Sequence, residues 1–305
     1  LHFEDFGVAN ARRILVNHRD EYRIFNDDMQ GTGAIVMAAV ISGLKVTGES
    51  FSDQRLVVFG AGTAGTGMAD QIHAAMVRDG LNEADARARI WLVDRDGLVT
   101  DDMDALPDYQ QAYARPASEV ASWKRHGRRI ELLDVVERVE PTILIGTSTL
   151  HNAFTEEVVT ALARGVERPI LLPLSNPTSR IEVSPEDAIR WSDGRALLAT
   201  GIPVPPIEYE GTAFHIGQGN NALLYPGLGL GTIVAGASRI TDGMLLAAAR
   251  AVAGQVDATP LGSSLLPAVE DLRASSATVA VAVIEAAQAD GVAAADVGDP
   301  VQAVL

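Results

Sequence analysis

The sequence predicts an α/β fold of the Rossmann type, in which a doubly wound, mostly parallel sheet is joined to part of a second domain. Short apolar runs alternate with helical patterns between about residues 56 and 200. A complete G-x-G-x-x-G sequence follows the first of those runs. Beyond Gly217 we expect helices only. Residues 27–217 are therefore expected to form the sheet domain, and residues 1–26 and 218–305 the partial second domain.

Composition limits the kinds of partner that fit this chain. Of its 305 residues, 47% are hydrophobic, which is enough for a globular protein with a sizeable core. The net charge of -16 argues against nucleic acid and against anionic membrane surfaces as partners. Cysteine is absent, which excludes disulfides and thiolate metal sites and fits a cytoplasmic location.

We also expect no membrane-spanning segment, because no apolar run approaches the roughly 20 residues that a bilayer requires. The stretch 225–237 is too short and too rich in glycine. The chain begins at Leu1 in the middle of a strand pattern, without an initiator methionine. We therefore expect it to be part of a longer polypeptide.

The first fifty residues predict one short strand and two helices. Residues 1–3 form the end of a strand, residues 8–19 read as an amphipathic helix, and an apolar helix extends to about Lys45. Asp27 and Asp28 come directly before that second helix. The simplest interpretation of these two acids is N-capping, a role that Asp and Asn fill very often.

The glycine-rich turn predicts a dinucleotide site. An apolar strand pattern at residues 56–59 precedes it, and a helical pattern follows it up to Gly80. In this context Gly60 permits the tight turn, Gly62 lets backbone N–H groups approach a pyrophosphate, and Gly65 lets the helix pack close to the strand. The helix N-terminus adds a partial positive charge. The expected cofactor-binding residues are Gly60, Ala61, Gly62, Thr63, Ala64 and Gly65. An ordinary tight strand–helix turn is the alternative.

Asp94 closes the second strand pattern, residues 90–93, where a ribose-binding carboxylate is expected. It comes later than the usual spacing of about 20 residues, and the polar insertion 82–89, which we expect to be helical, accounts for the delay. A carboxylate here repels a 2′-phosphate and favours NAD, whereas the guanidinium of Arg95 suits NADP. We expect NAD at Asp94 and Arg95, with NADP as the alternative. A strand-end turn residue is the other interpretation of Asp94.

The alternation then continues to about residue 200, with strands at 142–146, 169–174 and 196–199 and helices at 155–164 and 184–194. Ligands of such sheets bind at the carboxyl ends of the strands. We therefore expect Thr147 and Asn176 to join Gly60 and Asp94 in the cofactor site. The helices expected beyond Gly217 cover about 241–256 and 276–290.

Carboxylates gather on two short segments. Glu4 and Asp5 follow the first strand, and Asp28 precedes the second helix. Mg²⁺ and Mn²⁺ prefer such oxygen ligands, but acidic pairs are more often solvated surface or caps. The asparagines of two later turns are likewise turn residues by default: Asn176, Asn220 and Asn221. The residues alone leave both interpretations open.

Five segments carry further motifs, in order along nearly the whole chain. They are Phe3-Glu4-Asp5-Phe6 with Asn10-Ala11, residues 25–33 (FNDDMQGTG), 59–62 (FGAG), 174–178 (LSNPT) and 217–221 (GQGNN). Together they resemble the malic enzyme family, and the similarity extends to about Ile240. That family oxidatively decarboxylates malate to pyruvate and CO2 with NAD or NADP and with Mn²⁺ or Mg²⁺. Its members form dimers and tetramers, so a homo-oligomer is expected here.

The resemblance implies roles for individual residues. The metal ligands would be Glu4, Asp5 and Asp28, with Asp27 beside them in a supporting catalytic role. The residues that hold malate would be Asn176 and Asn220, with Asn221 adjacent to them. The segments 1–26 and 218–305 would belong to the substrate and metal domain, and residues 27–217 would bind NAD.

The sequence departs from the family in one respect. The family's catalytic lysine and tyrosine, and an arginine that binds a malate carboxylate, precede the Glu4-Asp5-Phe6 segment. The only lysines of this chain, Lys45 and Lys124, match no such role. We therefore expect the chain to bind a dinucleotide but to turn malate over poorly or not at all. The family's lysine that reads the 2′-phosphate of NADP also lacks a counterpart, because Gln110 and Gln111 occupy that neighbourhood.

Three alternatives remain open. A malolactic or oxaloacetate-decarboxylating relative would share these motifs, and net NADH production would distinguish it. A non-catalytic NAD-binding module would bind NAD without any effect of a metal on malate affinity. A Rossmann dehydrogenase of another substrate class would explain the glycine turn but would leave the acids and asparagines unexplained.

Overall fold

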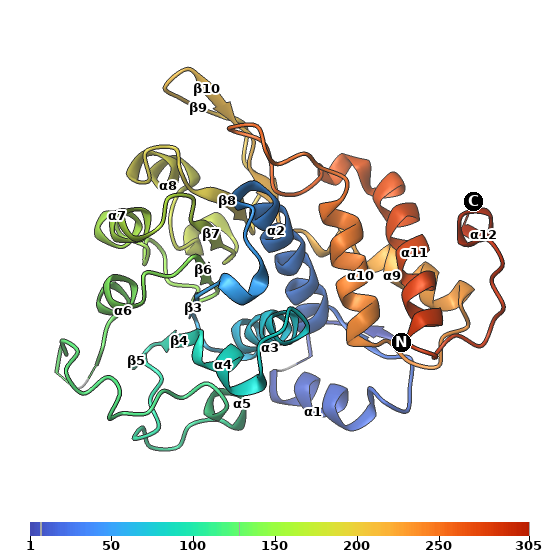
Figure 1. Ribbon diagram of the computed structural model, residues 1–305, viewed down its shortest axis with the longest axis horizontal. Coiled ribbons are helices and arrows are strands. Elements are labelled where there is room, and N and C mark those ends of the chain that lie inside the picture. The colour runs from blue at the N-terminus through green and yellow to red at the C-terminus, as the bar shows by residue number, and fades with distance from the viewer. Residues whose placement is uncertain (7, 128, 305) are drawn as a thin grey trace.

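A seven-stranded sheet forms the centre of the computed structural model, which describes residues 1–6, 8–127 and 129–304 (Figure 1). Its strands are β3 (Leu56–Phe59), β4 (Ile90–Asp94), β5 (Gly97–Leu98), β6 (Ile143–Gly146), β7 (Ile170–Pro173), β8 (Leu197–Thr200) and β11 (Gly217–Gln218). They lie in the order β11-β8-β7-β6-β3-β4-β5, and the neighbouring pairs are parallel except β4 with β5. The prediction of a doubly wound, mostly parallel sheet is confirmed.

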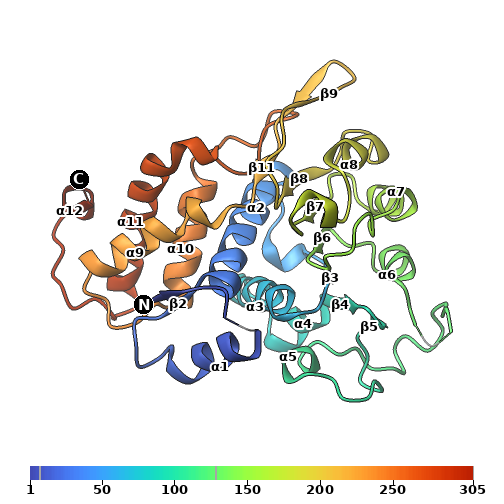
Figure 2. The same cartoon turned by 180° about the vertical axis from the view of Figure 1, so that it is seen from behind.

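Helices cover both faces of the sheet, which is why its strands are uninterrupted apolar runs. The covering helices are α2 (Thr32–Thr47), α3 (Thr63–Arg78), α6 (Leu132–Val139), α7 (Glu156–Gly165) and α8 (Pro185–Trp191). Figures 1 and 2 show α6, α7 and α8 on one side and α2 and α3 on the other. Successive residues of β3 divide between the two cores: Val57 packs with α6, α7 and α8, and Val58 with α2 and α3.

The connections of the sheet contain two short helices and a hairpin. They are α4 (Glu83–Ala88), α5 (Asp108–Gln111), β9 (Ile207–Tyr209) and β10 (Thr212–Phe214). The prediction of a helix at 82–89 is confirmed by α4, which Asn82 caps. The antiparallel hairpin of β9 and β10 projects from the body in both views and was not predicted (Figures 1 and 2). Its turn residues, Glu210 and Gly211, both have positive φ, as in the tight turns that close hairpins.

The amino-terminal segment forms a small parallel ribbon beside the main sheet. β1 (His2–Phe3) pairs with β2 (Phe25–Asn26), and α1 (Val8–His18) lies between them in the sequence. A π-helical turn, Asp27–Gly31, joins β2 to α2. The expectation that Asp27 and Asp28 are N-caps is wrong. The cap is Asn26, whose Oδ1 accepts a hydrogen bond of 2.8 Å from the backbone N–H of Met29.

The expectation that no segment is long and apolar enough to span a membrane is also wrong for one helical segment. Asp27–Thr47 has 21 residues and a mean hydropathy of 1.4. However, 78% of its most apolar window is buried inside the protein. A helix that is apolar on all sides is typical of a protein core, and α2 lies between the sheet and the carboxyl-terminal helices (Figure 1).

Four helices form the carboxyl-terminal part: α9 (Tyr225–Val234), α10 (Asp242–Ala253), α11 (Leu272–Ala289) and α12 (Pro300–Val304). The predicted helices at 241–256 and 276–290 are confirmed by α10 and α11. The expectation of no strand beyond Gly217 is wrong by one residue, because Gln218 pairs with Thr200 in β11. Figure 1 shows α10 beside α2, so this part packs directly on the core helix of the sheet domain.

Glycine permits the close approach of α9 to α11. A Cβ at Gly231 would lie 2.6 Å from the carbonyl oxygen of Ala280 and 2.8 Å from the side chain of Val283. We expect Gly231→Ala to lower the free energy of unfolding by about 2 kcal/mol, because overpacking must move one helix. Urea denaturation measures this loss. Gly229→Ala is the control: nothing lies within 4 Å of its Cβ position, so equal stability of the two variants would contradict the close packing.

Candidate functional site

The glycine turn lies at the switch point of the sheet, where β3 has β4 on one side and β6 on the other. Gly60 has a φ of 106°, and a Cβ there would lie 2.5 Å from the carbonyl carbon of Thr147. A Cβ at Gly65 would lie 2.2 Å from the Gly60 carbonyl oxygen. Thr147 Oγ1 donates a 2.8 Å hydrogen bond to that same oxygen. The loop after β6 therefore holds the turn closed on one side.

The middle glycine of the turn faces open space. Nothing lies within 4 Å of a Cβ built on Gly62, which is the N-cap of α3. The first residues of that helix, Thr63, Ala64 and Gly65, follow directly. A helix N-terminus presents unpaired N–H groups and a partial positive charge. An open approach to such a terminus is what a dinucleotide pyrophosphate requires.

Asp94 lies at the carboxyl end of β4, next to the glycine turn. Its Oδ1 accepts the N–H of Arg95 at 2.9 Å, and its Oδ2 accepts Gln110 Nε2 at 3.0 Å. Gln110 Nε2 also donates to the Ala61 carbonyl oxygen at 2.7 Å, so this side chain ties the acid to the turn. A cavity of about 870 Å³ opens beside Asp94 and Arg95. This role of Gln110 was not predicted, because nothing in the local sequence marks it.

A buried acid holds together the loops after β6 and β7. Glu182 is fully buried, and its carboxylate accepts the backbone N–H and hydroxyl of Ser148 at 2.8 and 2.9 Å. It also accepts the Ser175 hydroxyl at 2.5 Å. Asn176 follows Ser175 and is exposed at this edge of the sheet. Glu182 was not predicted. Its one signal in the sequence is its position as an acid between two apolar residues of a loop.

We expect Glu182→Gln to lower the free energy of unfolding by about 2 kcal/mol, because a buried carboxylate that accepts several hydrogen bonds becomes an amide with one acceptor. Urea denaturation at constant slope measures the loss. Glu186→Gln, at an exposed position of α8, is the control. A variant as stable as the parent chain would show that the two serine loops do not depend on this charge.

The parallel pairing of β1 with β2 brings the acidic segments together. Glu4 and Asp5 follow β1, and Asp27 and Asp28 follow β2, so both pairs lie at the same end of the ribbon. The backbone N–H of Asp5 donates to Asp28 Oδ2 at 3.0 Å. The possible ligand atoms of His2, Glu4 and Asp27 all lie within 4.8 Å of one another. Among the described residues, the structure therefore gathers His2, Glu4 and Asp27 as one possible ligand group. Of the predicted ligands it brings only Glu4 into this group, and it joins Asp5 to Asp28 through the backbone hydrogen bond.

Asp27 is the buried member of this acidic cluster, whereas Glu4, Asp5 and Asp28 are exposed. Asn221 Nδ2 donates to Asp27 Oδ2 at 2.9 Å. Asp27 Oδ1 has no hydrogen-bond partner among the described residues and lies 3.5 Å from His2 Nε2. His2 was not among the predicted residues, because only the ribbon register places it opposite Phe25.

The Gln218–Asn221 segment connects the sheet to this cluster. The backbone N–H of Gly219 donates to the Thr200 carbonyl at the end of β8, at 2.7 Å. Asn220 Oδ1 accepts the N–H of Ala222 at 3.0 Å. Asn221 then reaches both Asp27 and Thr32 Oγ1, the latter at 3.1 Å. Two of the three predicted asparagines therefore lie between the carboxyl ends of the strands and the acids.

The π-helical turn that carries Asp27 and Asp28 also packs against α3, the helix that begins at the glycine turn. Gln71 Nε2 donates to the carbonyl oxygen of Gln30 at 3.4 Å. A Cβ at Gly67 would be 3.7 Å from the Met29 carbonyl oxygen. The helix that begins at the glycine turn therefore contacts the turn that carries Asp27 and Asp28.

The acidic cluster has the donor chemistry of a hard divalent cation. Its carboxylates offer oxygen ligands, which Mg²⁺ and Mn²⁺ prefer. Asp27 Oδ1 is buried without a hydrogen-bond partner among the described residues and has only the His2 imidazole at 3.5 Å beside it. Such an oxygen is costly unless a cation or donor compensates it. The residues present therefore fit such an ion.

Comparison with known proteins decides the family. The sequence profile described as "Malic enzyme, NAD binding domain" matches residues 29–288. The chain belongs to the malic enzyme family. It is 55% identical over 306 residues to NAD-dependent malic enzyme 3 of Bacillus subtilis, covering 100% of this chain and 54% of that protein. It is 46% identical over 297 residues to the NAD-dependent malic enzyme of Acinetobacter baylyi, covering 96% of this chain and 52% of that protein.

Solved malic enzymes share the fold of this family member. The malic enzyme from Pyrococcus horikoshii superposes with a TM-score of 0.78 at 25% identity, covering 99% of this chain and 64% of that one. The NAD-dependent malic enzyme from Thermotoga maritima superposes with a TM-score of 0.68 at 25% identity, covering 94% and 66%. The chain spans about half the length of the curated relatives that it matches.

Proposed function

We propose that this chain carries the NAD site and the acidic cluster of an enzyme that oxidatively decarboxylates malate to pyruvate and CO2. The observation that supports this most directly is that α3 links the two sites: Gly62 of the glycine turn is its N-cap, and its Gln71 contacts the π-helical turn that carries Asp27 and Asp28. The relatives named NAD-dependent malic enzyme support NAD as the cofactor. Hydride transfer belongs to the cofactor, and the protein supplies binding and orientation.

We assign NAD rather than NADP from the residues at the end of β4. The Asp94 carboxylate is fixed by Gln110 and by the backbone of Arg95, so a negative charge stands at the expected ribose position. A carboxylate there accepts ribose hydroxyls and repels a 2′-phosphate. The Arg95 side chain lines the same cavity and is the feature that would favour NADP.

We propose Mg²⁺ or Mn²⁺ at the acidic cluster, held by Glu4, Asp5 and Asp28, with Asp27 beside them. Such an ion, when bound, lowers the pKa of the malate hydroxyl and stabilises negative charge as CO2 leaves. Asn221 orients Asp27 through its 2.9 Å hydrogen bond.

We assign the binding of malate to amide groups at the edge of the acidic cluster. Asn220 uses its Oδ1 within its own turn, which leaves its Nδ2 group as the donor that we assign to a malate carboxylate. Asn176, exposed after β7, is the second amide that we assign to malate.

We propose that malate turnover by this chain is slow. Lys45 lies 17 positions beyond Asp28 on a continuous helical run, a separation of about 25 Å at the rise of an α-helix, and its Nζ donates to the Ala253 carbonyl oxygen. Lys124 is exposed in the loop between α5 and α6. Neither lysine is placed to move a proton at the acidic cluster. We therefore expect the chain to bind and orient malate but to transfer protons inefficiently.

Calorimetric titration of malate, with NAD present and with or without MnCl2, tests the proposal. We expect NAD to bind alone and malate to bind only when Mn²⁺ is present. Over long incubations NADH and pyruvate should accumulate in equal amounts. Malate binding that is independent of Mn²⁺ would favour a non-catalytic NAD-binding module. Lactate without net NADH would indicate a malolactic reaction.

We also propose a homo-oligomer. Ile233 on α9 is 78% exposed, and Leu230 and Tyr225 on the same helix are exposed as well. Exposed apolar side chains gathered on one helix are typical of subunit contacts. Sedimentation velocity would detect a dimer or tetramer, and a monomer at all concentrations would contradict this. The cytoplasmic location and the absence of nucleic-acid and membrane partners stay predictions.

A further inference from the structure

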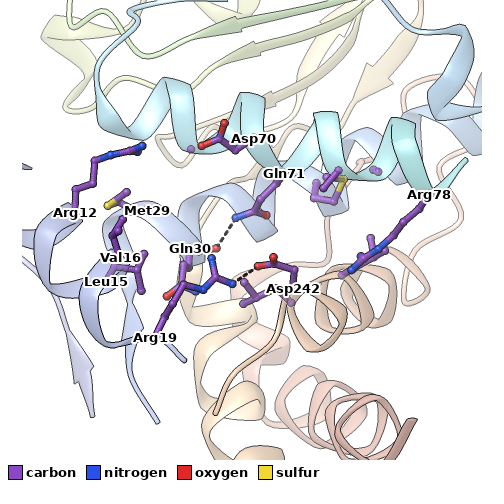
Figure 3. A pocket seen from close by; sticks show the side chains of 16 residues that line it. Arg12, Leu15, Val16, Arg19, Met29, Gln30, Asp70, Gln71, Arg78 and Asp242 are labelled. Carbon is purple, nitrogen blue, oxygen red and sulfur yellow. Dashed lines mark hydrogen bonds and ion pairs between the residues drawn. The ribbon is translucent and has the colours of Figure 1, made fainter. Parts of the chain in front are cut away.

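A second cavity, of about 270 Å³, lies between α1, α2, α3 and α10 (Figure 3). None of the residues assigned above to NAD, metal or malate lines it. Met29 and Gln30 form part of its wall, and they belong to the same π-helical turn as Asp27 and Asp28. An occupant of this cavity would therefore touch the turn that presents the acidic cluster.

The walls of the cavity are apolar and its ends carry arginines. Leu15, Met37, Ala74 and Leu245 supply apolar surface from four helices. Figure 3 shows Arg12 reaching in from α1 and Arg78 from the end of α3, on opposite sides of the cavity. Small-molecule sites typically combine apolar walls with a few polar groups of this kind, and this volume suits a ligand of roughly 10 non-hydrogen atoms.

The three arginines of the cavity differ in what lies beside their guanidinium groups. Arg19 forms an ion pair of 2.6 Å with Asp242. Asp70 stands in the field of Arg12 and accepts the hydroxyl of Tyr113 at 2.7 Å. Arg78 has no hydrogen-bond or ion-pair partner within the described parts of the chain and is exposed. Within the described parts of the chain, the guanidinium of Arg78 is therefore available to an anion at this end of the cavity.

Asp70 contributes less negative charge to the cavity than an ordinary aspartate would. Its side chain is open to the cavity, yet desolvation by the surrounding protein raises the pKa of its carboxyl, and this effect exceeds the opposing effects of Tyr113 and Arg12. A carboxyl that ionises less readily repels an incoming anion less strongly.

We propose that this cavity binds a small amphipathic monocarboxylate, with the carboxylate on Arg78 and the apolar body between α1, α2 and α3. A guanidinium and a carboxylate form paired, charge-assisted hydrogen bonds. The single negative charge of a monocarboxylate matches the guanidinium of Arg78. A dianion without an apolar body, such as phosphate, would meet Asp70 and Asp242 and would leave the apolar walls in contact with water.

Calorimetry with 4-bromobenzoate as the probe tests the proposal on the intact chain. We expect saturable binding of one molecule per chain, and binding at least about tenfold weaker for Arg78→Gln, the loss expected when one charge-assisted pair is removed. Ala74→Phe, which fills the cavity from α3, should weaken binding as strongly. Arg13→Gln is the matched control, because Arg13 is exposed on α1 and outside the cavity. 4-Bromobenzamide and orthophosphate should both bind at least tenfold more weakly than the probe.

Unchanged NAD affinity would show that each variant is folded, and a bromine anomalous signal from a soaked crystal would locate the probe. The proposal is overturned by the absence of saturable binding, by equal affinity in the parent and both cavity variants, or by equal affinity for the benzamide. A bromine peak outside the cavity would also overturn it. None of these measurements involves malate or a metal, so the outcome is independent of the proposed reaction.

Discussion

Replacing Gly62 with alanine is expected to lower the affinity for NAD by about a hundredfold, close to 2.7 kcal/mol, while the stability of the free protein stays the same. Gly62 has φ -71° and ψ -175°, a conformation that alanine adopts without strain. Nothing in the protein lies within 4 Å of the added Cβ. The methyl group would therefore meet only the ligand, at the point where backbone N–H groups must approach the pyrophosphate.

Fluorescence titration with NADH and urea denaturation separate these two effects. Gly298→Ala is the matched control, since its Cβ position is equally open and lies far along the chain from the turn. It should change neither quantity. Gly65→Ala should lower both the free energy of unfolding and the affinity for NADH. Its Cβ would be 2.2 Å from the Gly60 carbonyl oxygen, so the turn itself must move. Normal NADH affinity in Gly62→Ala would exclude the turn as the pyrophosphate site.

Replacing Asp27 with asparagine is expected to reduce Mn²⁺ affinity by about a hundredfold and to raise the melting temperature of the metal-free chain by about 2 °C. Asp27 is buried beside Glu4, and its Oδ1 has no hydrogen-bond partner among the described residues. An amide keeps an acceptor for Asn221 and offers a donor toward Glu4. We expect these gains to exceed the loss of the 3.5 Å contact with the half-exposed His2, so the metal-free protein becomes more stable. The substitution also removes one negative charge beside the ligands of the ion, and the affinity of hard cations depends on the number of such charges.

Electron paramagnetic resonance of free Mn²⁺ measures the affinity, and calorimetry measures the melting temperature. Asp20→Asn removes one exposed acid just beyond α1 and is the control for net charge. A gain in stability together with a loss of Mn²⁺ affinity is typical of a residue that is kept for binding although it destabilises the metal-free protein. An Asp27→Asn variant that melts earlier and binds Mn²⁺ normally would make Asp27 a structural acid.

Local patterns were sufficient for the sheet. β3, β4, β6, β7 and β8 are apolar runs bounded by turn residues, and each was predicted within a residue or two, because strands buried on both faces admit only apolar side chains. β5 and β11 are edge strands of two residues, and their pairing depends on neighbours that are distant in sequence. Patterns of this length carry too little information to predict them.

The parts of the candidate site that lie within one continuous segment could be predicted from the sequence. The parts that depend on contacts between distant segments could not. The glycine turn is contiguous, so its geometry follows from order and spacing. Gln110 binds partners 16 and 49 positions away in the sequence. Glu182 binds partners 7 and 34 positions away, and the ion-pair partner of His2 is 25 positions away. Only the fold brings such pairs together. The acids at β1 and β2 needed a family resemblance for the same reason, because nothing local distinguishes them from solvated surface.

The most direct test of the account asks whether the acidic cluster and the NAD site form one centre. Paramagnetic relaxation by Mn²⁺ of the protons of bound NAD reports that distance on the chain as it is. We predict strong enhancement for the nicotinamide protons, weak enhancement for the adenine protons, and loss of both in Asp27→Asn. Equal enhancement at the two ends of the cofactor, or none at either, would contradict the account.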